Sequence, residues 1–355
     1  MNKVLITGSS GLIGSEAVDF FYKKKFKIFA LDNDLRAKLF GKNYSTNNIK
    51  KYQKEKYKNI NFINIDIINK NKIENLFKKN KFDLIIHAAG QPSHDWSAKD
   101  PILDFNVNAV GTLNLLEMTR NYSPEAVFIF TSTNKVYGDT PNKLKGYVEK
   151  KSRFEVVRNK KLYSIDESMS IDYSKHSPFG VSKTSADLMV QEYGKYFGIK
   201  SVSFRCGCLT GPRHQGAELH GFLSYLIKCI VKGNHYNIYG YKGKQVRDNI
   251  HSYDLVNMFW HYFQNPGYGE VYNAGGGREN SISILETISI VNKILNKKWD
   301  KYTFINEERK GDHKWYITNF NKFQKKFKSW KLKYTNLDII DQIIRSNLIN
   351  AKKKY

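Results

Sequence analysis

The chain has 355 residues, enough to form a full hydrophobic core in one large domain or in two lobes. Hydrophobic residues make up 41% and aromatic residues 14% of it, which fits a globular protein and not a disordered one. Its 58 Lys and Arg outnumber its 33 Asp and Glu, and the formal net charge is +25. Because the lysines are scattered, with local clusters at 23–25, 50–58 and 352–354, we interpret this charge as a solvated basic surface and do not expect a nucleic-acid site.

The cysteines and the lengths of the apolar runs indicate the cellular compartment of the protein. Cys206, Cys208 and Cys229 are an odd number in a large chain, which argues against a disulfide scaffold and favours a reducing, cytoplasmic setting. No uninterrupted apolar run is long enough to span a bilayer, and the first run is too short for a signal peptide. No Cys or His pair follows Cys206 and Cys208 at the spacing of a zinc site, so we expect no metal and no membrane partner.

Apolar runs and helical patterns alternate along the chain. We expect strands at 4–6, 26–31, 61–65, 84–86, 126–131 and 201–204, and helices reaching residue 22 and at 70–79, 101–120, 178–197 and 283–295. This alternation predicts a doubly wound α/β fold, a parallel sheet with helices on both faces. Residues 36–58 are expected to form a surface excursion with some helix, and the polar stretch 138–177 to form a binding loop or lid.

A glycine-rich turn separates the first strand from the first helix. Gly8, Gly11 and Gly14 let the backbone turn tightly and approach a pyrophosphate, whose charge is met by the helix amino-terminus. Asp32, at the end of the second strand, can accept hydrogen bonds from both ribose hydroxyls and would repel a 2′-phosphate. The sequence therefore predicts a bound dinucleotide and favours NAD over NADP.

The Gly-x-x-Gly-x-x-Gly spacing resembles that of the extended short-chain dehydrogenase/reductase family, the NAD-dependent sugar-nucleotide epimerases and dehydratases. The resemblance implies a Rossmann NAD-binding domain at 1–206, which also receives parts of 244–275, and a smaller nucleotide-sugar-binding lobe formed mainly by 207–355. In such proteins the pair at 66–67 contacts the adenine, and the turn at 88–91 lies beneath the nicotinamide ribose. The implied cofactor-binding residues are Gly8, Gly11, Leu12, Ile13, Gly14, Asp32, Asn33, Asp66, Ile67, Ala88, Ala89, Gln91, Asn108 and Lys183.

Within this family, segments 89–91, 132–139, 176–178 and 243–248 are most similar to those of the CDP-paratose 2-epimerases. The similarity implies inversion of carbon 2 of a CDP-linked sugar in cell-surface polysaccharide synthesis, through a transient ketone formed with NAD. Guanidinium groups pair bidentately with the diphosphate in such sites. The implied substrate-binding residues are His94, Asn134, Lys135, His176, Arg247 and Arg309, and Arg205 is a further candidate with a structural role as its alternative.

Family members commonly form a four-helix interface from two long helices of each subunit. The helices after Pro101 and Pro178 stand at the matching places in this chain. We therefore expect a homodimer.

The active-site segment departs from the family pattern. In relatives, a tyrosinate held by a Lys and a Ser or Thr takes the hydroxyl proton, and these positions are Phe179, Lys183 and Thr133 here. Lys183 would still bind the nicotinamide ribose. Three explanations are open: another base acts, the protein binds ligands without turnover, or the Phe was introduced to trap a complex. The candidate bases are His94, His176, Tyr173, Tyr137, Lys135, Cys206 and a bridged water.

Two alternative functions are also open. A 4-epimerase or 4,6-dehydratase acting on another nucleotide sugar would share most of these motifs. A dehydratase is expected to place acidic residues beside Thr133, where Asn134 and Lys135 stand instead. The other alternative is a non-catalytic protein that binds NAD or a nucleotide sugar and docks RNA through its basic surface.

Overall fold

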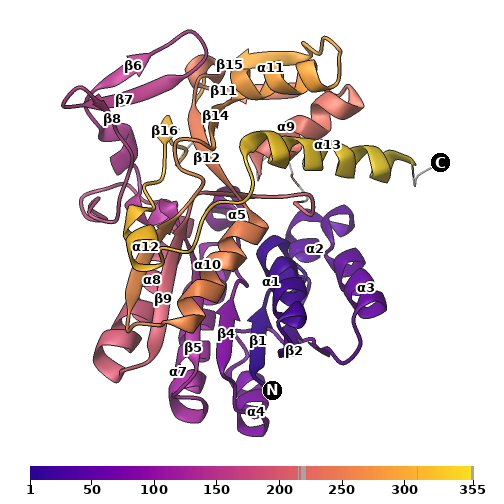
Figure 1. Cartoon of the computed structure of the whole chain (residues 1–355), viewed down its shortest axis with the longest axis vertical. Coiled ribbons are helices and arrows are strands. Elements are labelled where there is room, and N and C mark those ends of the chain that lie inside the picture. Colours follow the sequence, from indigo (N-terminus) through magenta and orange to yellow (C-terminus); the bar gives the residue numbers. More distant parts are fainter. Residues whose placement is uncertain (215, 217–220, 310, 353–355) are drawn as a thin grey trace. The chain divides into compact units, whose positions relative to one another are not determined.

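The computed structural model describes residues 1–214, 216, 221–309 and 311–352, and these divide into two compact units (Figure 1). The first unit consists of Met1–Val136, Ser177–Arg205 and Leu255–Tyr272, and the second of Tyr137–His176, Cys206–Asp254 and Asn273–Tyr355. Residues 137–176 cluster with the second unit, although the sequence-based division placed them with 1–206. The assignment of NAD to the first domain and of a nucleotide sugar to the second stays a prediction.

A seven-stranded sheet organises the first unit. Its strand order is β13-β9-β5-β4-β1-β2-β3, and the neighbouring pairs from β5 to β3 are parallel. The chain builds outward from β1 in both directions, so a crevice opens at the carboxyl ends of β1 and β4. This arrangement confirms the doubly wound prediction. The strands are β1 Lys3–Thr7, β2 Lys27–Leu31, β3 Asn61–Ile63, β4 Leu84–His87, β5 Val127–Thr133, β9 Lys200–Cys206 and β13 Glu270–Ala274.

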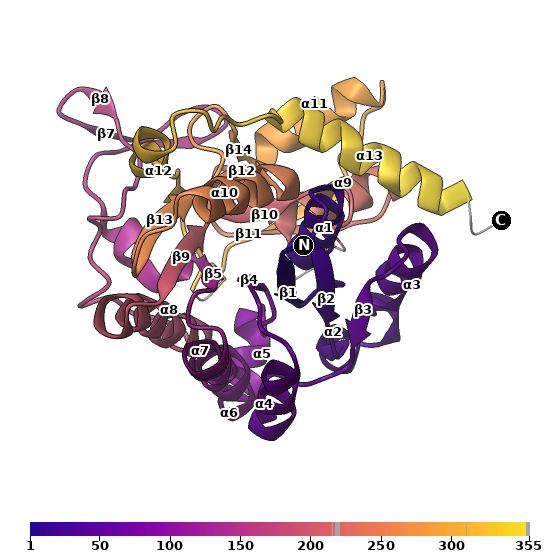
Figure 2. The same ribbon diagram turned by 60° about the horizontal axis from the view of Figure 1, so that its bottom comes forward.

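Helices cover this sheet, and Figure 2 shows α4, α6, α7 and α8 next to one another on one side of it. The predicted excursion at 36–58 contains two helices and a short 3-10 helix, Lys42–Tyr44. The helix expected at 101–120 is interrupted by a π-helical turn, Asn106–Val110. The helices are α1 Leu12–Lys23, α2 Leu35–Phe40, α3 Asn47–Lys56, α4 Lys70–Lys79, α5 His94–Lys99, α6 Pro101–Phe105, α7 Gly111–Tyr122, α8 Pro178–Phe197 and α10 Ser252–Gln264.

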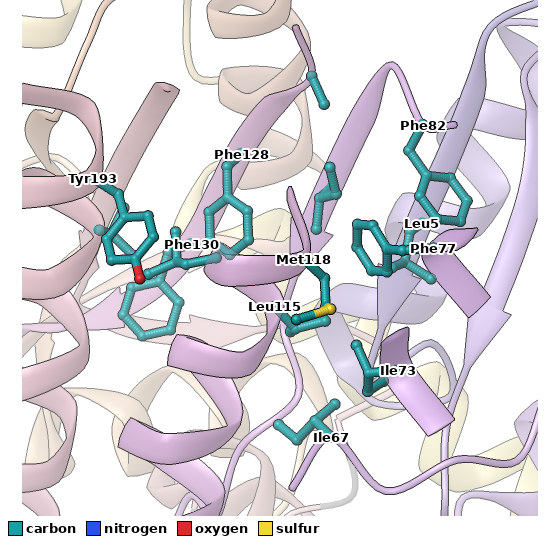
Figure 3. Packing of buried hydrophobic residues seen from close by; sticks show 14 of the residues in the cluster. Leu5, Ile67, Ile73, Phe77, Phe82, Leu115, Met118, Phe128, Phe130 and Tyr193 are labelled. Atoms are coloured by element: carbon teal, nitrogen blue, oxygen red, sulfur yellow. The ribbon is translucent and has the colours of Figure 1, made fainter. Parts of the chain in front are cut away.

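The core of the first unit lies between the sheet and these helices. Figure 3 shows side chains of β1, β4 and β5 packed against those of α4 and α7. Aromatic rings meet edge to face there, for example Phe77 and Phe82 at a centroid distance of 5.1 Å. Burial of this apolar surface is the main force that holds the sheet and its helices together. The cluster includes Leu5, Ile67, Ile73, Phe77, Phe82, Leu115, Met118, Phe128, Phe130 and Tyr193.

A buried ion pair joins α8 to β9. The Arg205 guanidinium lies 2.9 Å from the carboxylate of Asp187, and both side chains are almost fully buried. The Ser132 hydroxyl on β5 donates to the same carboxylate at 2.6 Å. Because a buried charge that loses its partner is costly, this pair fixes α8 against the sheet. Arg205 therefore has a structural role.

The described residues of the second unit form three small sheets. One is four-stranded, with β10 Cys208–Thr210, β12 Val246–His251, β14 Ser281–Ser283 and β16 Trp315–Tyr316, and another pairs β11 Tyr236–Tyr239 with β15 Tyr302–Ile305. Its helices α9 Phe222–Lys232, α11 Ile284–Ile294 and α13 Asn336–Lys352 enclose an apolar core, and α12 Asn321–Lys326 follows β16. Short 3-10 helices occupy Asn134–Tyr137, Thr140–Lys143 and Tyr241–Gly243.

The stretch 138–177 was expected to be a loop, and the structure corrects this expectation, while its role as a binding segment or lid stays a prediction. It contains a three-stranded antiparallel sheet of β6 Tyr147–Glu149, β7 Phe154–Arg158 and β8 Lys161–Leu162. These strands are short, and charged residues such as Glu149 and Arg158 lie on exposed positions in them. The sequence therefore lacks the apolar run or clean alternation that marks longer strands.

Within the described ranges, the structure has no helix with the length and apolar character needed to cross a membrane. Lys310 and the lysines at 353 and 354, which the sequence placed in a binding segment and a basic cluster, lie outside the described residues.

Candidate active site

The glycine turn after β1 touches the turn after β4. Gly8 has a φ of +66°, and a Cβ atom added to it would lie 2.8 Å from the carbonyl oxygen of Ala88. A Cβ added to Gly14 would lie 2.0 Å from the carbonyl oxygen of Gly8. The chain needs glycine at both places to bring this turn beneath the first turn of α1. The resulting cradle, beside the amino-terminus of α1, fits the pyrophosphate of a dinucleotide.

The carboxylate of Asp32 lies beside this turn. It accepts hydrogen bonds from the backbone N–H of Ser10 at 2.9 Å and of Asp34 at 2.8 Å. Burial raises the pKa of Asp32 above its usual range, and these two hydrogen bonds act in the opposite direction. The neighbouring Asn33 donates to Asp66 at 2.9 Å. The structure thus brings together three residues predicted to bind the adenosine half of NAD.

A buried histidine that the sequence analysis missed supports the turn after β4. Thr112 donates to the carbonyl oxygen of Asn108 at 2.6 Å, so its oxygen accepts the hydrogen on Nε2 of His87 at 2.9 Å. Nδ1 of His87 then accepts from the Thr7 hydroxyl at 2.8 Å, and that hydroxyl oxygen accepts the backbone N–H of Ala89. Burial lowers the pKa of His87 to about 3, and the charge of Lys183 acts in the same direction. The imidazole is therefore neutral in the folded protein.

Asn108 connects the turn after β4 to two helices. Its side-chain oxygen accepts from the backbone N–H of Gln91 at 2.9 Å, and its amide donates to Gln91 O and to Ser182 Oγ, each at 3.1 Å. The Asp104 carboxylate accepts from Gln91 Nε2 at 2.6 Å and from the Ser182 hydroxyl. Asn108 lies in the π-helical turn, a feature that often occurs at functional sites. This network fixes the position of α8, which carries Lys183.

Lys183 and Phe179 lie one helical turn apart on α8. The ammonium group of Lys183 donates to the carbonyl oxygen of Thr131 at 2.8 Å and lies 4.0 Å from the centroid of the Phe130 ring. The Phe179 ring is buried, with its centroid 4.8 Å from that of His94. At the end of β5, the Thr133 hydroxyl accepts from the backbone N–H of Lys135 at 3.2 Å.

His94 is held at the start of α8. Its Nδ1 lies 2.8 Å from the Ser177 hydroxyl, which also caps α8 by accepting the backbone N–H of Gly180 at 3.1 Å. The first unit therefore brings His94 next to Phe179, although the two residues are far apart in the sequence.

Two of the predicted diphosphate ligands lie in the second unit. Arg247 is buried and forms an ion pair with Asp312 at 2.6 Å. Burial raises the pKa of the Tyr236 hydroxyl, and the positive charge of Arg309 acts in the opposite direction. His176, also in this unit, contacts Ser174 at 3.2 Å.

A buried carboxylate in the second unit was missed by the sequence analysis. Asp248 on β12 accepts the backbone N–H of Gly277 at 2.9 Å, and Gly207 and Gly275 pack closely against it. Burial raises the pKa of Asp248 to about 6. The carboxylate fixes the glycine-rich segment after β13.

The fold and the glycine turn define a dinucleotide-binding protein of the Rossmann type. A sequence model of the family described as the NAD dependent epimerase/dehydratase family matches residues 4–275, and the chain belongs to this family. The predictions of the family, of the α/β fold and of NAD as the cofactor are confirmed.

Relatives within this family carry out different reactions. The chain is 33% identical over 301 residues to a CDP-paratose 2-epimerase from Salmonella typhi. This match covers 83% of the chain and 85% of that protein. It is 26% identical over 342 residues to a dTDP-glucose 4,6-dehydratase from Escherichia coli, covering 93% and 88%.

A solved structure of similar fold is a UDP-glucuronic acid 4-epimerase from Bacillus cereus with one tyrosine replaced by phenylalanine, in complex with UDP-4-deoxy-4-fluoro-glucuronic acid and NAD. The TM-score is 0.78 at 25% identity, and the match covers 99% of this chain and 100% of that one.

Replacing Gly14 by Ala should destabilise the protein by about 1–3 kcal/mol, because the new methyl group overlaps the carbonyl oxygen of Gly8. Gly11→Ala is a matched control, since its Cβ meets a single atom at 3.2 Å, and its stability should change by well under about 1 kcal/mol. Urea unfolding measures both changes. Equal midpoints for the two variants would contradict the close contact. Calorimetry with NAD should show weaker binding for both variants: the methyl group of Gly11→Ala stands where the backbone approaches the pyrophosphate, and that of Gly14→Ala displaces the turn itself.

Stability should fall as the pH falls from about 6.5 toward 3, because unfolded His87 binds a proton that the folded protein excludes. The measured quantity is the difference between the free energy of unfolding of the wild type and that of His87→Gln. This difference should decrease by up to about 1.4 kcal/mol for each unit by which the pH falls within this window. Urea titrations at several pH values measure this difference. A difference independent of pH would show that His87 does not stay neutral.

Proposed function

We propose that the protein is an NAD-dependent nucleotide-sugar epimerase that inverts carbon 2 of a CDP-linked sugar. The observation that carries this proposal is the 33% identity to a CDP-paratose 2-epimerase over 83% of the chain. The segments 132–139 and 243–248, which resemble those of such epimerases, contain the site residues Thr133 and Arg247, respectively. A role in polysaccharide synthesis belongs to the same proposal.

The reaction must overcome the low acidity of the hydrogen on carbon 2. No carbonyl group stands beside that carbon, so simple deprotonation does not invert it. NAD supplies a group that takes a hydride from the carbon and returns it to the opposite face. The protein must therefore remove the proton of the hydroxyl group on this carbon and later return it.

The residues of the first unit support cofactor binding. The backbone at Gly8 and Gly14 and the amino-terminus of α1 receive the pyrophosphate, and Asp32 accepts the ribose hydroxyls of the adenosine half. Lys183, held on the carbonyl of Thr131, is within α8 at the position that binds the nicotinamide ribose in this family. The hydrogen-bonded chain through His87 keeps the turn at Ala88 and Ala89 rigid beneath that ribose.

The substrate is held by polar and basic groups. Arg247 and Arg309 bind the diphosphate, because guanidinium groups match phosphate oxygens in geometry and charge. Arg247 is already oriented by its ion pair with Asp312 and by its hydrogen bond to the carbonyl oxygen of Val246. His94, Asn134, Lys135 and His176 contact the sugar in this proposal.

Conversion of a CDP-sugar tests the proposal. Purified protein mixed with CDP-paratose in D₂O should invert carbon 2, as followed by NMR, and carbon 2 should keep its own hydrogen because the hydride does not exchange with solvent. Deuterium at carbon 2 would instead indicate direct deprotonation and contradict the ketone route. Mass spectrometry of the denatured protein should identify the released NAD.

The same assay separates the alternatives. UDP-glucose that becomes its 4-epimer, or dTDP-glucose that loses water, with no change in any CDP-sugar, would replace the proposed reaction by that of another family member. No turnover of any nucleotide sugar would favour a protein that binds without catalysis.

We also propose that α6 and α8 form a homodimer interface. Ile102 and Phe105 on α6 and Val181 and Leu188 on α8 are large apolar residues that are at least 42% exposed. The two helices pack against each other and are drawn side by side in Figure 2. Val181 and Leu188 are two helical turns apart and share one face. A second copy of the chain would remove this apolar surface from water.

The variant Leu188→Lys should shift the protein from dimer to monomer, because a symmetric interface places two copies of the new charge close together. Analytical ultracentrifugation measures the change. Leu162→Lys is the matched control, since Leu162 is 50% exposed in the second unit compared with 45% for Leu188. If Leu188→Lys and Leu162→Lys both have the same molecular mass in solution as the wild type, this interface is contradicted.

A further inference from the structure

The position that should carry the catalytic hydroxyl is occupied by Phe179, whose ring cannot exchange a proton. The ring is buried on α8, four residues before Lys183. Loss of a positioned general base costs roughly a hundred- to ten-thousandfold in rate, so an active enzyme needs a replacement. The replacement must lie beside this ring and must accept a proton at neutral pH.

We propose that the imidazole of His94 replaces the missing tyrosine hydroxyl as the group that takes and returns the substrate proton. This inference rests on the proposed epimerase function. The His94 ring lies against the Phe179 ring, with a centroid distance of 4.8 Å and an interplanar angle of 59°. Imidazole is the side chain whose ordinary titration range makes it a base near neutral pH.

The hydrogen bonds around His94 orient its ring. Ser177 Oγ accepts the backbone N–H of Gly180 and lies 2.8 Å from Nδ1 of His94. The distance fits either direction of this hydrogen bond, and the proposed role takes the tautomer in which Nδ1–H donates to the hydroxyl oxygen and Nε2 is the basic nitrogen. Because Ser177 is the N-cap of α8, His94 is attached to the helix that carries Phe179 and Lys183.

The element that carries His94 is itself anchored. His94 begins α5, whose N-cap Ser93 accepts the backbone N–H of Trp96, and the Ser97 hydroxyl donates to the carbonyl of His94 at 2.7 Å. Helix α5 packs against both α6 and α8. Gln91, three residues before His94, forms hydrogen bonds with Asn108 and Asp104. A base needs this kind of fixed position to act in one geometry.

Three of the other candidate bases, Tyr137, Tyr173 and Cys206, are less suited. The hydroxyl of Tyr137 is fully buried and donates to Asn273 at 2.8 Å. Tyr173 is fully exposed to solvent, and Cys206 is buried on β9.

In the proposed step the O–H bond at carbon 2 breaks and its proton goes to Nε2 of His94. Bound NAD would supply the oxidant that accepts the hydride from carbon 2. The sugar becomes a ketone. In the return step a hydride reaches the opposite face of carbon 2, and the proton on Nε2 returns to the oxygen.

The test compares His94→Gln, Phe179→Tyr and the double variant in the inversion of carbon 2 of CDP-paratose. His94→Gln should lower kcat by roughly a hundred- to ten-thousandfold. Phe179→Tyr should restore most of this loss in the double variant, because the phenol and Lys183 recreate the pair used by relatives. His235→Gln, a change of an exposed histidine in the second unit, is the matched control and should keep the wild-type rate.

Binding measurements separate catalysis from structure. The NAD content and the calorimetric affinity for the CDP-sugar should change less than about threefold in His94→Gln, because the fold does not depend on this proton. A larger loss of either would mean that His94 positions a ligand, and this would overturn the inference.

The remaining outcomes are also decisive. An active wild type whose His94→Gln variant keeps its rate within tenfold would overturn the inference and leave the epimerase function intact. A double variant that binds both ligands but regains no activity would overturn it as well. A wild type that converts no nucleotide sugar would overturn the proposed function first, and the inference with it.

Discussion

The backbone contact between Gly8 and the pair Ala88–Ala89 is the constraint on which the rest of the site depends. It holds the carboxyl ends of β1 and β4 so close that no side chain fits between them. The two turns therefore form one surface, and the helix amino-terminus and Asp32 are positioned relative to it. A small shift here would displace both the pyrophosphate site and the turn that leads to His94.

Polar groups inside the first unit transmit this constraint. The chain from Thr7 through His87 and Thr112 ends on the carbonyl of Asn108, whose side chain binds Gln91 and Ser182. Each donor in the chain has an acceptor, so burial of these groups costs little and their orientation is fixed. The cofactor turn, α6 and α8 are thus linked by hydrogen bonds and not by apolar packing alone.

Much of the sheet was predictable because buried parallel strands appear in the sequence as short apolar runs, as at 84–86. The helix predicted at 70–79 has these bounds in the structure. The sheet within 138–177 was missed because its polar strands lack such runs. His87 was missed because its partners, Thr7 and Thr112, are distant in sequence and only the tertiary structure brings them together. The contact of His94 with Phe179 could not be predicted for the same reason.

The π-helical turn Asn106–Val110 determines how the residues before and after it are oriented about the helix axis. In an α-helix each residue is rotated by about 100° about the axis from the one before it. The extra residue in the π turn therefore changes the direction in which the side chains of α7 point relative to those of α6. Asn108 faces Gln91, while Leu115 and Met118 on α7 face the hydrophobic core. A regular helix of the same sequence would satisfy only one of these orientations. Removing one residue from this turn would therefore rotate Asn108 away from Gln91 or Leu115 away from the core, and so separate the active site from the core that supports it.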